Sequence, residues 1–212
     1  MIKIEHIETF GFETAIRGMR NPYNSWEKSD SRWTHDYEPG TEKYIVGEND
    51  LSLMKRLFKG GTEHRKYLRM IFVSLDITAP LYWWKEFDTY KVGTVANSCS
   101  TMHTIAAKEF ERSDFSTEHL IPRMLDVLDV TIANLNACRG NYLECKDKKW
   151  WWQLIQLLPS SYNQKRTVTM NYENVYTILR QRRGHKLDEW NELCAVLSQL
   201  PYVKEIADEK GN

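Results

Sequence analysis

The sequence lacks long hydrophobic runs and carries no excess of charge of either sign. It has no window of about 18 uninterrupted apolar residues, so we expect no membrane-spanning helix. Lysine plus arginine equals aspartate plus glutamate, at 29 each, which argues against bulk nucleic-acid binding, although RQRRGHK could hold one anion. The start, MIKIEHIETF, has charges among its apolar residues and no small-residue cleavage site, so we expect a cytoplasmic protein.

Cysteine pairs at metal-binding or redox spacing are also missing. The four cysteines are widely spaced and include no CxxC pair, which predicts free thiols. The histidines His103, His119 and His185 show no metal-ligand spacing with a pair of carboxylates. We therefore expect no metal site.

Internal repeats and low-complexity segments are absent, and 212 residues with 42% apolar composition can bury a core. We expect a single domain over residues 1–212. Alternating patterns predict strands at 2–10, 66–79 and 165–171. Spacing of 3.6 residues predicts helices at 12–20, 49–59, 80–91, 104–110, 119–139, 148–159, 171–183 and 187–200. This order predicts an α+β fold with a small, mostly antiparallel sheet packed against several helices.

Aromatic residues are abundant, with eight tryptophans and eleven tyrosines. Large rings build cores and subunit interfaces more often than ligand-stacking sites, so we favour core and interface roles for these rings, and for Trp150–Trp152 in particular. The small polar residues at 94–101 are expected to form a loop, and their chemistry allows two interpretations. They could cradle phosphate oxygens with backbone N–H groups and hydroxyls, or they could simply cap the following helix.

Several short segments resemble the flavin-dependent thymidylate synthases. In that family a strand ends in Ala-Pro, a helix follows, and the helix leads into the motif R-H-R-x7-S. Here Ala79–Pro80 supplies the dipeptide, and an ungapped count replaces the motif with Thr89, Tyr90, Lys91 and Cys99.

Two further segments are similar to family patterns, and the resemblance spans about residues 13 to 200 with sparse identities. AIRGMRNPY places Arg17 and Arg20 at two arginine positions of the first helix. A later segment runs from Leu-Pro through Thr-x-Asn into a helix that ends in a substrate-binding arginine, which falls on Arg182 or Arg183. The matching residues there are Leu158, Pro159, Thr169 and Asn171.

The sequence departs from the family where phosphate is bound. Motif arginines are replaced by Thr89 and Thr101. Glu173 stands where the family has an arginine beside its asparagine. Charge-assisted contacts are worth about 1.5–3 kcal/mol each, so losing two would weaken nucleotide binding about a hundredfold unless other groups replace them. The replacement cations that the resemblance brings near the site are Arg17, Arg20, Lys66, Arg180, Arg182 and Arg183.

The resemblance implies a flavin-dependent thymidylate synthase-like fold, a homotetramer, FAD as cofactor, and reduced folate and NADPH as co-substrates. The implied activity is transfer of a one-carbon group to a deoxyuridine nucleotide, a methyltransferase reaction of nucleotide biosynthesis. Two alternatives are a catalytically retired module that binds a nucleotide or a partner, and a one-carbon transferase with another pyrimidine nucleotide or product. The implied FAD contacts are Lys66, Tyr90, Lys91 and Asn171, and the implied nucleotide contacts are Glu86, Ser98, Cys99, Ser100, Arg182 and Arg183.

No side chain is expected to act as a covalent catalyst. The family does not require a cysteine that attacks the pyrimidine, so the protein's task is mostly orientation and electrostatics. Cys99 has no histidine at a telling spacing, so we interpret it as a packed or loop thiol. Glu86 is equally consistent with an ordinary exposed helix acid, and His64 with a surface turn residue.

Overall fold

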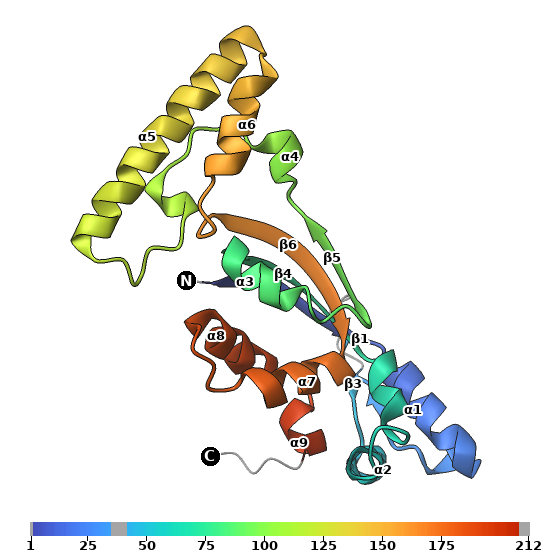
Figure 1. The fold of residues 1–212 in the computed structure, drawn as a ribbon. Helices are drawn as coiled ribbons and strands as arrows, with labels where there is room; N and C mark the ends of the chain where they lie inside the picture. Colours follow the sequence, from blue (N-terminus) through green and yellow to red (C-terminus); the bar gives the residue numbers. More distant parts are fainter. Residues whose placement is uncertain (1, 35–41, 208–212) are drawn as a thin grey trace. The chain divides into compact units, whose positions relative to one another are not determined.

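The computed structural model describes residues 2–34 and 42–207 and has an α+β architecture (Figure 1). Four strands form one sheet in the order β1-β4-β6-β5, and β2 pairs with β3 in an antiparallel ladder that joins Arg32 to Ile45 and Trp33 to Tyr44. The expected class, a small and mostly antiparallel sheet with several helices, is confirmed. The strands are β1 (Lys3–Phe10), β2 (Arg32–Trp33), β3 (Tyr44–Ile45), β4 (Phe72–Pro80), β5 (Thr94–Ser98) and β6 (Asn163–Asn171).

The helices follow most of the predicted segments. Short 3-10 turns connect them at η1 (Asn21–Tyr23), η2 (Trp26–Lys28), η3 (Arg65–Met70) and η4 (Arg112–Asp114). The α-helices are α1 (Phe12–Arg20), α2 (Glu48–Lys59), α3 (Leu81–Phe87), α4 (Thr101–Thr104), α5 (Pro122–Cys145), α6 (Lys148–Leu157), α7 (Tyr172–Arg182), α8 (Asp188–Leu197) and α9 (Val203–Ala207).

The chain divides into two compact units, and each strand of the four-stranded sheet contributes residues to both. The first unit comprises Met1–Glu5, Asp76–Thr89 and Ala96–Thr167. The second comprises His6–Leu75, Tyr90–Val95 and Val168–Asn212. The expectation of a single domain over residues 1–212 stays a prediction.

Strand β4 shows the alternation that the sequence predicts, but it begins later. Ile71, Val73 and Leu75 are buried, whereas Phe72 and Ser74 between them are only half-buried. The predicted strand from residue 66 is wrong at its start, because Arg65–Met70 forms a 3-10 helix instead. That turn ends where the Ile71 N–H donates to the Leu68 carbonyl, at 3.4 Å, and the extended strand follows.

The adjacent tryptophans on α3 belong to the hydrophobic core. Trp83 and Trp84 are both fully buried and pack edge to face with centroids 4.9 Å apart. The indole N–H of Trp84 donates to the Gln164 carbonyl at 2.9 Å, and the Arg166 guanidinium lies 4.2 Å from the Trp84 ring centre. This burial agrees with the general expectation that large rings build the core.

The predicted helix at 80–91 is too long, since α3 ends at Phe87. Pro80 is the last residue of β4 and the N-cap of α3, and the Leu81 and Tyr82 N–H groups donate to the Tyr162 and Ser160 carbonyls, each at 3.0 Å. These bonds satisfy donors that a helix start leaves open.

The small polar residues after α3 form strand β5 rather than a loop, which corrects the expectation for 94–101. The Cys99 N–H donates to the Lys165 carbonyl at 3.0 Å, so pairing with the β6 segment continues past Ser98. Ser100 is the N-cap of α4, because its hydroxyl accepts from the His103 N–H at 3.3 Å. The capping interpretation therefore holds for Ser100.

The predicted helix at 104–110 is also wrong, since α4 ends at Thr104. Tertiary contacts from α5 replace the helical bonds. The Asn136 amide accepts from the Phe110 N–H at 2.8 Å and donates to its carbonyl at 3.0 Å, while Arg139 donates to the Ala106 carbonyl at 3.0 Å. Ile105 and Phe110 can then enter the core that α5 and α6 share.

That core fills the space between α5 and α6, which run side by side (Figure 1). Trp151 packs against it and Trp150 is half-buried, whereas Trp152 is exposed, so the triple tryptophan only partly serves the core. The buried members are Ile105, Phe110, Phe115, Leu128, Ile132, Leu135 and Leu154.

Candidate functional site

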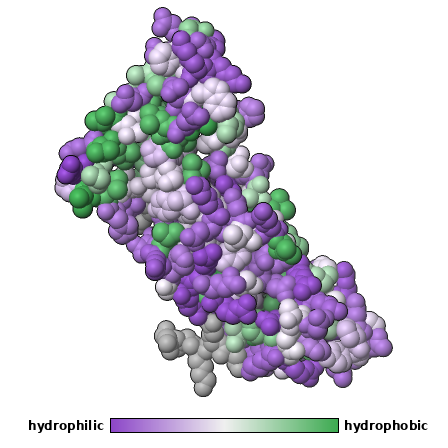
Figure 2. All heavy atoms as spheres, viewed as in Figure 1, coloured by the Kyte–Doolittle hydropathy of each residue, from purple (hydrophilic) through white to green (hydrophobic). Residues whose placement is uncertain are grey.

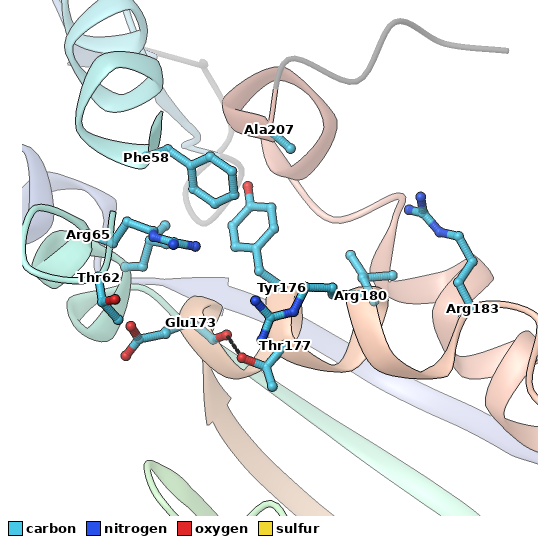
Figure 3. A pocket seen from close by; sticks show the side chains of 11 residues that line it. Phe58, Thr62, Arg65, Glu173, Tyr176, Thr177, Arg180, Arg183 and Ala207 are labelled. Carbon is cyan, nitrogen blue, oxygen red and sulfur yellow. Dashed lines mark hydrogen bonds between the residues drawn. The ribbon is translucent and has the colours of Figure 1, made fainter. Parts of the chain in front are cut away.

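A pocket of about 550 Å³ lies in the second unit and is lined by three arginines (Figure 3). Its walls come from α2, η3, α7 and α9. We call it the arginine pocket. Its polar and aromatic lining consists of Arg65, Arg180, Arg183, Glu173, Thr62, Thr177, Phe58 and Tyr176.

Helix α7 supplies most of the wall because of its spacing. Glu173, Tyr176, Thr177 and Arg180 occupy positions i, i+3, i+4 and i+7, which share one helix face. The Asn171 side chain caps the helix by accepting from the Asn174 N–H at 3.0 Å. At the other end, the backbone of Arg183 turns to an extended conformation, and its side chain still lines the pocket.

Arg65 carries the least satisfied polar group of this pocket. Its Nε is buried and has no hydrogen-bond partner among the residues that the structure describes. The guanidinium lies 5.0 Å from the Phe58 ring centre, and Figure 3 shows it pointing toward Phe58 and Tyr176. Buried donors are almost always paired in native proteins, so this group is suited to an acceptor that a ligand brings.

Among the lining residues that the structure describes, the one carboxylate is already paired. Arg69 donates from Nε to Glu173 Oε2 at 2.5 Å and from its terminal nitrogen to Oε1 at 3.3 Å. This hydrogen bond and the Glu173 charge raise the pKa of Arg69. The Thr177 hydroxyl donates to the Glu173 carbonyl at 2.9 Å, drawn as a dashed line in Figure 3. The three arginines therefore leave the pocket with a positive balance that suits an anion.

A second cluster on α7 surrounds Arg182. Its guanidinium lies 4.5 Å from the Trp190 ring centre and 5.6 Å from that of Tyr90. Its Nε donates to the Tyr90 hydroxyl at 2.9 Å, and a terminal nitrogen lies 3.1 Å from His185 Nε2. The Tyr90 hydroxyl in turn donates to Gln181 at 2.9 Å. Arg182 is thus held against two rings, whereas its neighbour Arg183 lines the arginine pocket.

Two crystal structures of flavin-dependent thymidylate synthase ThyX from Helicobacter pylori, both with FAD and dUMP, are similar to this chain. Each has a TM-score of 0.64 and covers 98% of this chain; one is 18% identical with 97% of its own length covered, the other 19% identical with 96% covered. The chain has the fold of a flavin-dependent thymidylate synthase. Neither a protein-family model nor a curated protein sequence matches it.

Within this thymidylate synthase fold, all four predicted FAD contacts lie in the second unit, but none of them lines the arginine pocket. Three of them, Tyr90, Lys91 and Asn171, lie near one another. The Asn171 N–H donates to the Gly93 carbonyl at 3.2 Å, which ties the turn after Tyr90 and Lys91 to the start of α7. Gly93 has a φ of 73°, and a Cβ there would lie 2.3 Å from the side-chain amide nitrogen of Asn171, so this close approach requires glycine. Lys91 is exposed, whereas Tyr90 and Asn171 are buried.

Lys66, the fourth predicted FAD contact, lines a different pocket of about 640 Å³, together with His64 and Tyr67. The 3-10 turn explains the separation, because it directs Arg65 and Lys66, which are consecutive, into different cavities. His64 is exposed at the N-cap of that turn, in agreement with the surface interpretation.

Four predicted nucleotide contacts belong to the first unit and do not line the arginine pocket. Glu86 is half-buried on α3, Ser98 and Cys99 are exposed at the end of β5, and Ser100 caps α4. The Cys99 thiol is exposed, as a loop thiol would be, and all four cysteines are free. Their roles in binding stay predictions.

Arg20 is not available as a replacement cation. It is buried and donates to the Asp50 carboxylate at 2.6 Å and to the Ser25 and Lys28 carbonyls at 3.2 and 3.1 Å. Arg17 is exposed and lines none of the pockets described here. Arg180 and Arg183 do line the arginine pocket, as their segment led us to expect.

Sequence reasoning missed Arg65, Phe58, Tyr176 and Thr177. Tyr176 and Thr177 could have been found from α7, where polar and aromatic residues recur at helical spacing on the face beside the apolar one. For Arg65 the only clue was a cluster of cations before β4. In the described part of the chain, no three metal-ligating side chains gather, and no helix has the length and apolarity to cross a bilayer.

Proposed function

We propose that this protein binds FAD and a pyrimidine deoxynucleotide and transfers a one-carbon group to a deoxyuridine nucleotide. Two observations support the proposal: the shared fold with thymidylate synthases that hold FAD and dUMP, and an arginine pocket whose buried Arg65 Nε has no partner in the described residues. The Arg65 environment carries most weight, because it is observed in this chain itself.

The residues present fit a dinucleotide cofactor. Arg65 and Arg180 would neutralise phosphate oxygens of the cofactor, and each charge-assisted hydrogen bond contributes about 1.5–3 kcal/mol. Phe58 and Tyr176 offer ring surface, and their centroids lie 4.7 Å apart. When bound, FAD supplies hydride chemistry that no side chain of the protein provides.

Arg182 and Arg183 are both candidates for the nucleotide contact, and their surroundings suit different parts of the nucleotide. Arg183 is exposed at the pocket wall, so it can meet a phosphate directly. Arg182 lies over the Trp190 ring and donates to the Tyr90 hydroxyl, an arrangement that suits a planar base edge. Reduced folate and NADPH complete the proposed reaction as co-substrates, and the proposed compartment is the cytoplasm.

We infer that the protein is a homotetramer. An apolar strip on α5 supports self-association, and Figure 2 shows hydrophobic residues gathered over that helix. Another part of the α5 surface packs in the core through Leu128, Ile132 and Leu135. Exposed residues of the strip are Met124, Val127 and Val130.

A second candidate function is a retired enzyme that binds a nucleotide or partner without turnover. The Arg69–Glu173 pair favours it, because a carboxylate occupies a position where the family resemblance predicts an arginine. The remaining variant of the first proposal is a transferase with a different pyrimidine nucleotide or product.

An activity assay with C5-tritiated dUMP, FAD, methylenetetrahydrofolate and NADPH separates these functions. We expect tritium release and rescue of a thymidine auxotroph by the wild-type protein. Release without rescue indicates another product. FAD and dUMP binding without release indicates the retired module, and no binding of either ligand contradicts the proposal.

The paired substitution Arg182→Ala with Arg183→Ala should weaken dUMP binding by about a hundredfold or more, because two cationic contacts are lost. Isothermal titration calorimetry with dUMP measures the change. Arg112→Ala is the matched control, since its exposed pair with Asp129 lies in the first unit. Unchanged affinity in the double variant would remove both arginines from the site.

A further inference from the structure

A second large cavity in the second unit is lined by aromatic rings and carboxylates, whereas the arginine pocket is lined by cations. It measures about 730 Å³ and lies between the β1–α1 junction, the β2–β3 pair and the segment that leads into α9. It shares no lining residue with the arginine pocket. We call it the aromatic–acidic pocket, and its rings are Phe10, Phe12, Trp33, Tyr44 and Tyr202.

A single glycine brings two of these rings to the cavity. Gly11 joins β1 to α1 with a φ of 93°, and a Cβ there would lie 2.1 Å from the Met70 carbonyl oxygen. The tight turn lets both Phe10 and Phe12 line the pocket. Phe10 stacks on Phe72 at 5.5 Å, and Phe12 meets Tyr202 edge to face, also at 5.5 Å.

The rings are anchored yet still open to a ligand. Trp33 meets Tyr44 edge to face at 5.3 Å, and the Tyr202 hydroxyl accepts from the Val46 N–H at 3.0 Å. Phe10 and Trp33 nevertheless remain 47% and 48% exposed. Large rings that are held in place and left half-exposed around a cavity of this size are typical of a ligand site.

The charges in this wall are mainly negative. Glu13 and Glu205 line the pocket with Glu42, and Lys43 is the single cation among the described lining residues. Glu13 Oε2 accepts from the Trp33 indole N–H at 3.3 Å, so one carboxylate is held at the edge of a ring. Burial raises the pKa of Tyr44, and the Asp50 and Glu13 charges raise it further, which agrees with a negative potential here.

We propose that the aromatic–acidic pocket binds an organic cation, a protonated amine or guanidinium carried on an apolar body. Ring faces attract cations through their quadrupole, by about 0.5–2 kcal/mol per contact, and the carboxylates add charge complementarity. The apolar body would cover the exposed parts of Phe10 and Trp33. The inference does not depend on the proposed function, since it uses other residues and the opposite charge.

Three probes of one shape test the charge requirement: phenethylamine, phenethyl alcohol and 3-phenylpropionate. In 15N-labelled protein, the Trp33 indole N–H signal, assigned with Trp33→Phe, reports binding because that group bonds to Glu13. We expect saturable shifts with the amine below about 10 mM and much weaker shifts with the alcohol and the acid.

The paired substitution Glu13→Gln with Glu205→Gln should weaken phenethylamine binding about fivefold to tenfold. Glu8→Gln is the control, because Glu8 is exposed on β1 outside the pocket. Equal binding of all three probes, an unchanged affinity in the double variant, or no shift with any probe would overturn the inference.

The cation could be a free amine or an arginine side chain of a partner protein. Acetyl-Gly-Arg-Gly-amide distinguishes the sources. Tighter binding of the peptide than of phenethylamine indicates a partner's arginine, and tighter binding of the amine indicates a small metabolite.

Discussion

Among individual residues, Asp50 is a buried carboxylate that accepts several hydrogen bonds. Its side chain is fully buried and accepts from Arg20 at 2.6 Å, from the Ser29 hydroxyl at 2.7 Å and from the Ser31 hydroxyl at 2.6 Å. Burial alone would raise the pKa of Asp50, but the hydrogen bonds from Ser31, Ser29 and Arg20 outweigh it and lower the pKa. One carboxylate therefore fastens the segment after α1 to α2.

Asp50→Asn should lower the free energy of unfolding by about 3–5 kcal/mol, because the buried Arg20 charge would lose its partner. Urea unfolding measures this change. Asp129→Asn is the control, since its ion pair with Arg112 is half-exposed, and we expect a loss of less than about 1 kcal/mol. Equal effects of the two substitutions would contradict this role.

The same carboxylate predicts a direction for the pH dependence. Because the pKa of folded Asp50 is lowered, its contribution to stability is complete above about pH 4, near the ordinary aspartate pKa. It is lost as the pH falls through the lowered value. The wild-type unfolding free energy should therefore fall more steeply below pH 4 than that of Asp50→Asn.

Among the secondary-structure elements, two glycines make a matched test of backbone geometry. Gly11→Ala should destabilise the protein by more than about 3 kcal/mol, because the new Cβ would meet the Met70 carbonyl at a strained φ. Gly140→Ala lies in helix α5 with nothing within 4 Å, so it should stabilise the protein by up to about 1 kcal/mol. Thermal unfolding compares the two, and a stabilising Gly11→Ala would contradict the assigned turn.

Most elements could be predicted because their periodicity is strong and local. Helices α1, α2, α6, α7 and α8 occupy the segments that the 3.6-residue spacing indicated, and β1, β4 and β6 those of alternating pattern. The errors arise where tertiary bonds decide. Asn136 and Arg139 of α5 take the backbone groups of 106–110, and β6 draws 94–99 into a strand, and neither partner is visible in the local sequence.

The candidate site was predictable only in part. The family resemblance pointed to the segment that ends in Arg182 and Arg183, and α7 does carry the arginine pocket's wall. It could not reveal that the 3-10 turn sends Arg65, and not Lys66, into that pocket. Such a choice depends on backbone geometry over a few residues, for which the sequence carries no periodic signal.

For the whole molecule, the exposed strip on α5 predicts self-association. Val127→Asp with Val130→Asp should convert the proposed tetramer to smaller species, because two charges would be buried in an apolar interface. Light scattering after size-exclusion chromatography measures the mass. Gln156→Asp adds a charge at an exposed position of another helix, α6, and should leave the mass unchanged. An unchanged mass in the double variant, or a monomeric wild-type protein, would contradict the assignment.

The central claim is that the arginine pocket holds the phosphates of a flavin cofactor. Titration of FAD into the purified protein, followed by flavin fluorescence, tests it most directly, with Arg65→Met as the variant and Arg112→Met as the control. We predict saturable binding to the wild type and the control, and a Kd at least about tenfold higher for Arg65→Met with unchanged circular dichroism. Absence of FAD binding by the wild type, or an equal Kd in the folded variant, would contradict the account.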